Sequence, residues 1–165
     1  MDVIRRYTSL QPIMGRFAHG DDLIEALQHF CQTEAIEAAW VTVIGAVSRA
    51  TLSYYDQTTH QYKNRVYEGH YEIIHCTGNI SLKGGEQPDG RHPVSPMAHL
   101  HMVLSDENYQ TIAGHVIPGG ARVFAGEFLI SALMNPQGRP LRRGKADPQT
   151  GLPLWPADGP PASAR

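Results

Sequence analysis

Three histidines in the second half of the chain have the spacing to hold a metal ion. His99 and His101 are separated by one residue. Alternate residues of a β-strand project from the same face, about 6 to 7 Å apart along the backbone. His115 lies in a second β-rich segment shortly after them. Three neutral imidazoles are a frequent set of Zn²⁺ ligands and leave a fourth position open, although imidazole also suits Ni, Cu and Fe. We therefore predict a three-histidine metal site, with zinc as the first choice. The alternative is a polar strand face in water or at a subunit contact.

His115 joins the other two histidines only if the connecting loop has an odd number of residues. If the loop is 106–108, Ser105 pairs with Tyr109 and His99 lies directly opposite His115. A loop with an even number of residues and no bulge would turn His115 to the other face of the sheet, because side chains alternate along a strand. The metal hypothesis therefore requires an odd loop.

Glu127 is the second unusual residue. It shares a predicted strand face with apolar residues such as Val123 and Leu129, where an unpaired carboxylate is costly to bury. It is a candidate fourth metal ligand, a hydrogen-bond acceptor for a histidine N–H, or a catalytic general base acting on bound water. The alternative is an ion pair with an arginine such as Arg16 or Arg122.

One strand-rich domain has to position these groups. The chain has 165 residues, 41% hydrophobic and 18% charged, which fits a single domain with a sizeable core and argues against a disordered or coiled-coil protein. Apolar residues at helical spacing predict one helix over 21–35, with Asp22 and Glu25 as a capping box at its start. Segment 40–47 is apolar enough to predict a central strand buried on both faces. We predict an α/β (α+β) fold in which an antiparallel-rich mixed sheet packs against the one helix. The predicted strand segments are 40–47, 50–55, 71–76, 80–82, 99–104, 111–117 and 122–133.

The composition divides the chain into a domain over 1–134 and a C-terminal tail over 135–165. A Gly- and Pro-rich loop over 83–96 leads into the histidine motif, and long loops of this kind are often functional. The tail is rich in Pro, Gly and basic residues, and its Leu-Pro-Leu-Trp-Pro stretch is predicted to dock on its own domain or on a neighbouring subunit.

The remaining sequence features restrict location and partners. No segment has the character of a signal peptide or a membrane span, so we expect a cytoplasmic protein without membrane contact. Cys31 and Cys76 lie in apolar segments and are predicted to be reduced, buried thiols. The net charge is −2, so any contact with DNA must be local rather than made by the whole surface.

Four motifs in the first 134 residues carry a recognisable pattern. They are Gly20-Asp-Asp-Leu-Ile-Glu-Ala-Leu, Val43-Ile-Gly-Ala-Val-Ser-Arg-Ala-Thr-Leu, His99-Leu-His-Met-Val-Leu-Ser-Asp and Gly114-His-Val-Ile. Together they resemble the PPC domain, the plants and prokaryotes conserved domain, over about residues 3 to 134. The resemblance implies an antiparallel-rich sheet against a helix, a homotrimer, and metal binding in some prokaryotic relatives through the histidines that match His99, His101 and His115. It also implies a predicted DNA-binding role of the stand-alone prokaryotic type.

The tail departs from the plant members, in which AT-hook motifs accompany this domain. The nearest segment keeps Gly138-Arg139-Pro140 but has Gln137 where the motif carries an arginine. With Arg142, Arg143 and Lys145 it forms a candidate basic arm for the minor groove of DNA. The leading hypothesis is a homotrimeric DNA-binding or regulatory protein with a zinc site. The alternatives are a metal-dependent enzyme or small-molecule binding protein that uses the open histidine site, and a structural oligomerisation domain.

Overall fold

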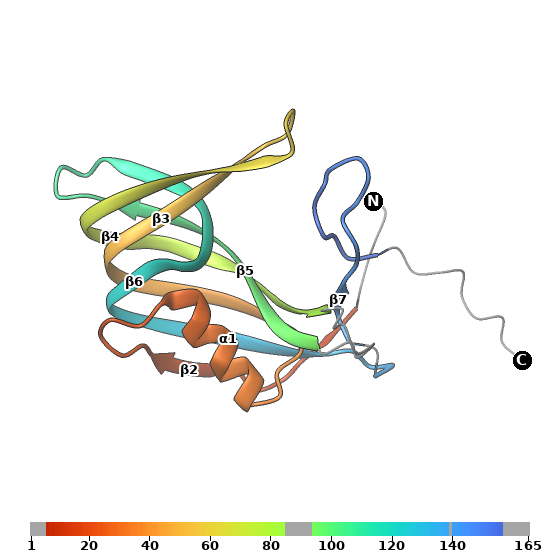
Figure 1. Ribbon diagram of the computed structural model, residues 1–165. Helices are drawn as coiled ribbons and strands as arrows, with labels where there is room; N and C mark the ends of the chain where they lie inside the picture. The colour runs from red at the N-terminus through yellow and green to blue at the C-terminus, as the bar shows by residue number, and fades with distance from the viewer. Residues whose placement is uncertain (1–5, 85–93, 139, 157–165) are drawn as a thin grey trace, which may run out of the picture.

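Four long antiparallel strands form the framework of the protein (Figure 1). The computed structural model describes residues 6–84, 94–138 and 140–156. Three short strands and one helix complete the fold. In chain order the elements are β1 (Thr8–Ser9), β2 (Ile13–Arg16), α1 (Leu23–Thr33), β3 (Ala39–Asp56), β4 (Gln61–Gly84), β5 (Val94–Ser105), β6 (Thr111–Met134) and β7 (Arg142–Arg143).

The long strands close into a ring, as the strongly curved ribbons of Figure 1 show. β6 pairs with β5 through its first five residues and with β3 along most of its remaining length. β4 pairs with β3 on one side and with β5 on the other. The predicted antiparallel-rich sheet with one helix is confirmed. The closure of the sheet was not predicted.

Bulges explain why the strands are longer than the predicted segments. The register between β3 and β4 shifts between Val43 and Gly45 and again between Val47 and Arg49. A bulge bends and twists a strand without ending it. The segments predicted as 40–47 and 50–55 therefore join into β3, and those predicted as 111–117 and 122–133 join into β6, whose register with β3 shifts between Ala50 and Leu52. β4 unites the segments 71–76 and 80–82 without a register shift between them.

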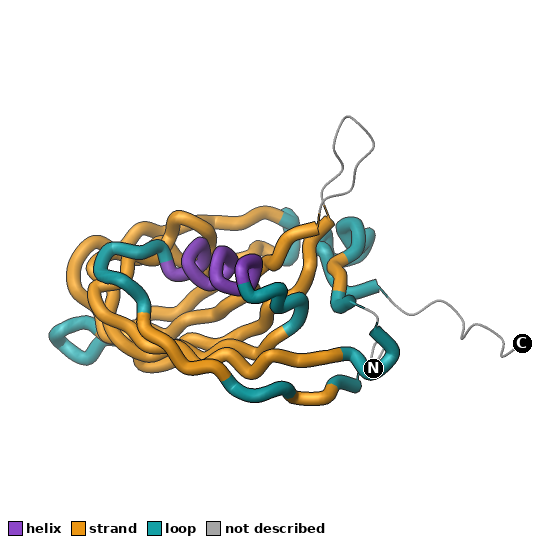
Figure 2. The backbone as a smooth tube through the Cα atoms, turned by 90° about the horizontal axis from the view of Figure 1, so that it is seen from below, coloured by secondary structure: helices purple, strands orange, loops and turns teal. Residues whose placement is uncertain are grey.

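The helix begins and packs as its sequence indicates. Asp22 caps it, because the Asp22 Oδ1 atom accepts the backbone N–H of Glu25 at 3.0 Å. The second carboxylate oxygen accepts the N–H of Ala121 in β6 at 3.1 Å, so the cap also fixes the helix to the sheet. The apolar face lies against β5 and β6 inside the curve of the strands (Figure 2). Its buried residues are Leu23, Ile24, Leu27 and Cys31.

The prediction that 40–47 is buried on both faces is wrong. Val41 and Val43 are buried, but Trp40 is 51% exposed and Ile44 is 55% exposed. The helix covers only the inner face of the sheet, so β3 alternates between buried and exposed side chains in this stretch. Among the described residues, no helix is long and apolar enough to cross a membrane.

The loop and the tail differ in how much of them the structure describes. β4 continues through Gly84 and β5 begins at Val94, so most of the predicted loop lies outside the described residues. The tail is described over 135–138 and 140–156, and at β7 it returns to the sheet beside β4 (Figure 1). Leu141 is buried, and its carbonyl oxygen accepts the Leu82 N–H at 2.8 Å.

Candidate metal centre

The three predicted histidines lie together on the outer face of β5 and β6. One ligand nitrogen from each of His99, His101 and His115 lies within 4.8 Å of the others. Their ring centroids are 5.1 to 5.5 Å apart. Between them on β5, Leu100 points inward and is fully buried in the core. The strand alternation predicted from the sequence therefore holds at this site.

The predicted register was nevertheless wrong by one pair. His101, not His99, lies opposite His115, and Ser105 pairs with Thr111. The loop therefore has five residues, 106–110, rather than three. The number is still odd, so all three imidazoles stay on one face.

Local hydrogen bonds explain the longer loop. The Asp106 side chain accepts the backbone N–H groups of Asn108 at 2.8 Å and Gln110 at 2.9 Å. The Tyr109 N–H donates to the Asp106 carbonyl at 3.0 Å, and Tyr109 takes the left-handed conformation with φ of 60°. An aspartate that bonds to the backbone that follows it stabilises such a turn. These bonds hold the turn closed around Asp106.

Gly114 lets β6 approach β3 closely beside His115. A Cβ atom at this position would lie 2.9 Å from the Leu52 Cβ and 3.1 Å from the Ser53 carbonyl oxygen. Ser53 is also the β3 partner of His115. A larger residue would push the strands apart, so the Gly-His pair in the sequence positions the third imidazole.

The environment keeps two of the three rings neutral at pH 7. Burial, together with the positive charge of Arg143 and the other two histidines, lowers the pKa of His99 to about 4. Burial, His101 and Arg143 lower the pKa of His115 to about 4. Metal ligands must be unprotonated, so these neutral imidazoles suit a metal ion. The donor set fits the predicted zinc.

Arg143 contacts this site from the C-terminal tail. Its guanidinium donates to the Ser81 Oγ at 3.0 Å, the Asn79 Oδ1 at 3.1 Å and the Pro153 carbonyl oxygen at 3.2 Å. It also lies 3.2 Å from the His99 Nδ1 atom. A guanidinium has only donors, so the His99 Nδ1 atom accepts this bond and the Nε2 atom of the neutral ring carries the proton. A metal ion that binds His99 would therefore have to displace this contact or this proton. Arg143 is therefore held against β4 and β5, and its predicted contact with DNA stays a prediction.

The other residues of the predicted basic arm are placed differently. The Arg142 and Lys145 side chains are exposed. Arg139 lies outside the described residues. Arg142 is exposed while Arg143 faces the sheet, because successive side chains alternate in β7. This strand pairs in parallel with Leu82 and Lys83 of β4. The proposed contact of Arg139, Arg142 and Lys145 with DNA stays a prediction.

Glu127 is not brought to the histidines. Its strand partners are Arg16 in β2 and Ile44 in β3, its side chain is exposed, and the histidine cavity described below does not include it. The reason is a bulge at Phe124, which gives β6 one residue more than β3 between the pairs Val47–Val123 and Ala46–Ala125. The bulge reverses the alternation, so Glu127 does not share the buried face of Val123. The predicted roles as fourth ligand or general base have no support in this placement, and the ion pair of Glu127 with Arg16 or Arg122 stays a prediction.

A cavity of about 610 Å³ opens beside the three histidines. Its walls come from β5, β6, the hairpin between β3 and β4, and the tail. Tyr62 stacks on His115 with centroids 5.5 Å apart, and Tyr55 lies 4.8 Å from Tyr62. The lining residues are Ser53, Tyr54, Tyr55, Gln57, Tyr62, His75, Thr77, His99, His101, Met102, Val103, Ala113, Gly114, His115 and Leu152.

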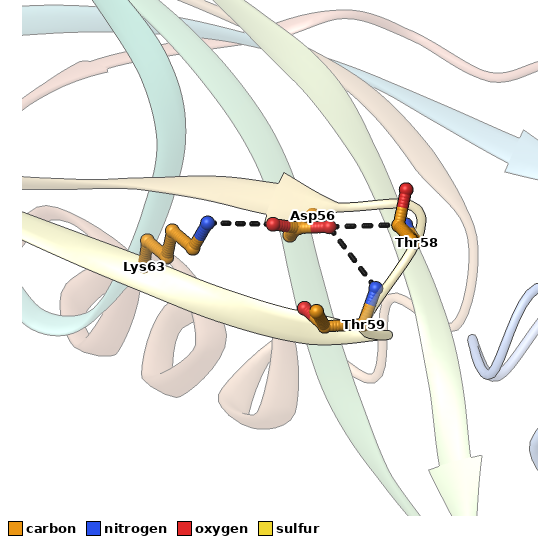
Figure 3. Close-up of polar contacts among 4 residues, drawn as sticks. All are labelled: Asp56, Thr58, Thr59 and Lys63. Carbon is orange, nitrogen blue, oxygen red and sulfur yellow. Dashed lines mark hydrogen bonds and ion pairs between the residues drawn. The ribbon is translucent and has the colours of Figure 1, made fainter.

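Asp56 holds the hairpin that carries the two tyrosines (Figure 3). Its carboxylate accepts the backbone N–H groups of Thr58 and Thr59 at 3.0 Å each and the Lys63 ammonium at 2.5 Å. These contacts hold the pKa of Asp56 well below its usual range. Tyr55 is anchored to the tail as well, because its hydroxyl donates to the Thr150 carbonyl oxygen at 2.6 Å. The hairpin and the tail thus form one wall of the cavity.

The tyrosines and the contact of Arg143 with His99 were not recognised from the sequence. Their signal was weak: two tyrosines flank the turn between β3 and β4, and polar Asn79 and Ser81 alternate with apolar residues in β4. Neither pattern indicates that an arginine 62 residues after Ser81 bonds to Ser81 and Asn79. His75, interpreted from the sequence as a core or interface histidine, is exposed and lies among the cavity residues.

Comparisons with known proteins agree on one family. The Plants and Prokaryotes Conserved (PCC) domain matches residues 4–134. A metal-containing protein of Archaeoglobus fulgidus superimposes with a TM-score of 0.79 and 30% sequence identity, covering 93% of this chain and 98% of its own. The plant- and prokaryote-conserved (PPC) protein of Pyrococcus horikoshii superimposes with a TM-score of 0.79 and 28% sequence identity, covering 93% of this chain and 96% of its own. A candidate DNA-binding protein of Ralstonia eutropha superimposes with a TM-score of 0.68 and 26% sequence identity, covering 87% of this chain and 89% of its own.

A fourth relative is a much longer protein. The bifunctional protein GlmU of a Synechococcus strain is 30% identical over 105 residues, which is 63% of this chain. The match covers only 14% of that relative's length.

Proposed function

Because the chain belongs to the plants and prokaryotes conserved domain family, we propose that it is a homotrimeric DNA-binding or regulatory protein that holds zinc through His99, His101 and His115. The observation that carries the zinc proposal is the convergence of the three ligand nitrogens within 4.8 Å. The metal-containing relative of Archaeoglobus fulgidus supports it. Zinc on three imidazoles would act as a Lewis acid with one open position. A cytoplasmic location belongs to the same proposal.

Elemental analysis of protein purified without a histidine tag tests the zinc site. We expect about one zinc ion per chain in the native protein and its loss in His101→Ala, because two imidazoles rarely suffice for a stable site. His29→Ala is the matched control, since His29 is an exposed histidine on α1. Native protein without stoichiometric metal, or equal metal in His101→Ala, would refute the site.

An exposed apolar patch on the outer face of the sheet supports the trimer. Trp40 and Ile44 are exposed on β3. Leu129 of the neighbouring β6 and its strand partner Met14 of β2 are exposed as well. Met14 is 78% exposed. Exposed large apolar side chains grouped on one face of a sheet are typical of a subunit contact.

Light scattering on a sizing column tests the oligomer. We expect three times the chain mass of 18.2 kDa for the native protein. Ile44→Asp should give the monomer mass, because it places a charge in the apolar contact. Tyr109→Asp, which changes the 88% exposed loop tyrosine, should leave the trimer intact. A native protein of monomer mass would refute this part of the proposal.

The DNA-binding part is supported by the relatives and by the exposed tail cations Arg142 and Lys145. A mobility-shift assay with an A·T-rich duplex tests it. We expect a shift that weakens as salt rises, and a loss of affinity in Arg142→Ala with Lys145→Ala. Arg65→Ala, another exposed arginine, is the control. Absence of a shift at low salt would refute DNA binding.

One observation favours a second function, that of a small-molecule binding protein or metal-dependent enzyme. The cavity beside the histidines has a volume of about 610 Å³, within the range of about 300–1,000 Å³ that is usual for ligand sites. A DNA-binding arm alone does not explain a cavity that includes three candidate metal ligands.

A further inference from the structure

Among the described residues, the lining of the cavity beside the three histidines contains no charged side chain. The lining residues include histidines, tyrosines, Gln57, Ser53 and Thr77, but no Asp, Glu, Lys or Arg. Three neutral imidazoles would leave both charges of a divalent ion uncompensated. In many other metal sites a carboxylate ligand of the protein supplies negative charge that offsets part of the charge of the ion.

The nearest charged group described at the cluster makes the imbalance larger. Arg143 lies 3.2 Å from the His99 Nδ1 atom and carries a positive charge of its own. Glu127, the carboxylate expected here from the sequence, lies elsewhere on the sheet. A metal-loaded site would therefore be a strongly positive point at the end of an otherwise neutral cavity. Its natural complement is an anion.

The shape of the walls restricts the rest of the ligand. Tyr62 stacks on His115 at an interplanar angle of 27° and remains 48% exposed. Tyr55 meets Tyr62 at 58°, and Leu152 of the tail belongs to the same lining. Aromatic rings bind planar groups by stacking or by edge contacts. The wall next to the metal ligands thus fits a planar, mainly apolar group.

We propose that this cavity binds a small carboxylic acid with a planar apolar body, with the carboxylate at the three-histidine end and the body against Tyr62 and Tyr55. The inference rests on the proposed metal site and adds the class of its ligand. The anionic group satisfies the charge that the described lining residues leave uncompensated, and the tyrosine wall selects an aromatic acid over a bare anion. Inorganic phosphate, which has the charge but not the planar body, is the competing occupant.

Cobalt-substituted protein tests this directly, because the visible spectrum of Co²⁺ changes when its ligands change. The full-length native protein is loaded with Co²⁺ and titrated separately with benzoate, acetate, benzyl alcohol and inorganic phosphate. We expect benzoate to change the spectrum and to bind about tenfold more tightly than acetate or phosphate. Benzyl alcohol, which has the ring without the charge, should leave the spectrum unchanged.

A variant at the tyrosine wall separates the two contributions. Tyr62→Leu should weaken benzoate about fivefold and leave acetate unchanged, because it removes a ring contact and no charge. Tyr109→Leu, an exposed loop tyrosine outside the cavity, should change neither. Equal affinities for benzoate and acetate, or tighter binding of phosphate, would overturn the inference. Cobalt uptake with a spectrum unchanged by benzoate would overturn it while leaving the metal site standing. Failure to take up cobalt would overturn both.

Discussion

Arg143→Met is the change that best tests how the tail is attached. Methionine keeps most of the length and apolar stem of the arginine but removes the guanidinium. The variant loses hydrogen bonds to Ser81, Asn79, His99 and the Pro153 carbonyl oxygen. The bonds to Ser81, Asn79 and His99 connect the tail to β4 and β5, whereas the bond to Pro153 lies within the tail, so we expect the tail to detach more often.

The loss of docking free energy depends on which of the former hydrogen-bond acceptors of Arg143 water can reach. Ser81 is fully buried, and an orphaned buried polar group costs about 1–3 kcal/mol. The three other acceptors lie nearer to solvent and can be rehydrated, so their loss adds roughly 1 kcal/mol together. We therefore expect tail docking to weaken by about 2–4 kcal/mol, which corresponds to roughly a 30- to 700-fold larger open population.

Limited proteolysis of the metal-free protein with trypsin measures this population. Cleavage after Lys145 is followed, since Arg143→Met and the control Arg142→Met both keep that site. When opening and closing are fast, the rate of cleavage follows the open fraction. We expect Arg143→Met to be cut at least about 30-fold faster than the native protein. Arg142→Met, the neighbouring exposed arginine, should be cut within about twofold of the native rate.

Two results would refute this reasoning. Equal cleavage rates for the two arginine variants would show that the four contacts of Arg143 do not hold the tail. Rapid cleavage of the native protein after Lys145, at the rate of an unfolded peptide, would show that the tail is not docked at all.

Three further predictions concern the site and the core. Arg143→Met should bind Co²⁺ about tenfold more tightly, because the native guanidinium, 3.2 Å from the His99 Nδ1 atom, repels a divalent ion held by the same ring. Unchanged or weaker binding in a competition titration would contradict this. Gly114→Ala should lower the free energy of unfolding by about 1–3 kcal/mol and weaken metal binding, because its methyl group would meet Leu52. Urea denaturation measures the stability and the same competition titration measures the metal affinity. A variant as stable as the native protein would argue against the close approach of the strands. Burial raises the pKa of Cys31 to about 11 and that of Cys76 to about 12, so at pH 8 both remain thiols and iodoacetamide should modify neither until denaturant is added; rapid labelling of the native protein would show that one is accessible.

The sequence was sufficient wherever a feature depends on local periodicity. The helical spacing of Leu23, Leu27 and Cys31 and the position of Asp22 determine where α1 begins and which face it buries. The alternation of His99 and His101 places both rings on one face of a strand, whatever the rest of the chain does. An odd loop was the one condition for His115, and the turn around Asp106 meets it.

Tertiary structure decided every feature that depends on bulges or on distant segments. A single extra residue at Phe124 removes Glu127 from the buried face, and such a bulge costs too little in a strand to leave a clear signal in the sequence. The helix covers one face of the sheet, so an apolar segment such as β3 is exposed at Trp40 and Ile44. Arg143 lies beside His99 because the chain returns to β4 at β7, 44 residues after His99. Local propensities cannot specify such a return, because it depends on the packing of elements that must already be folded.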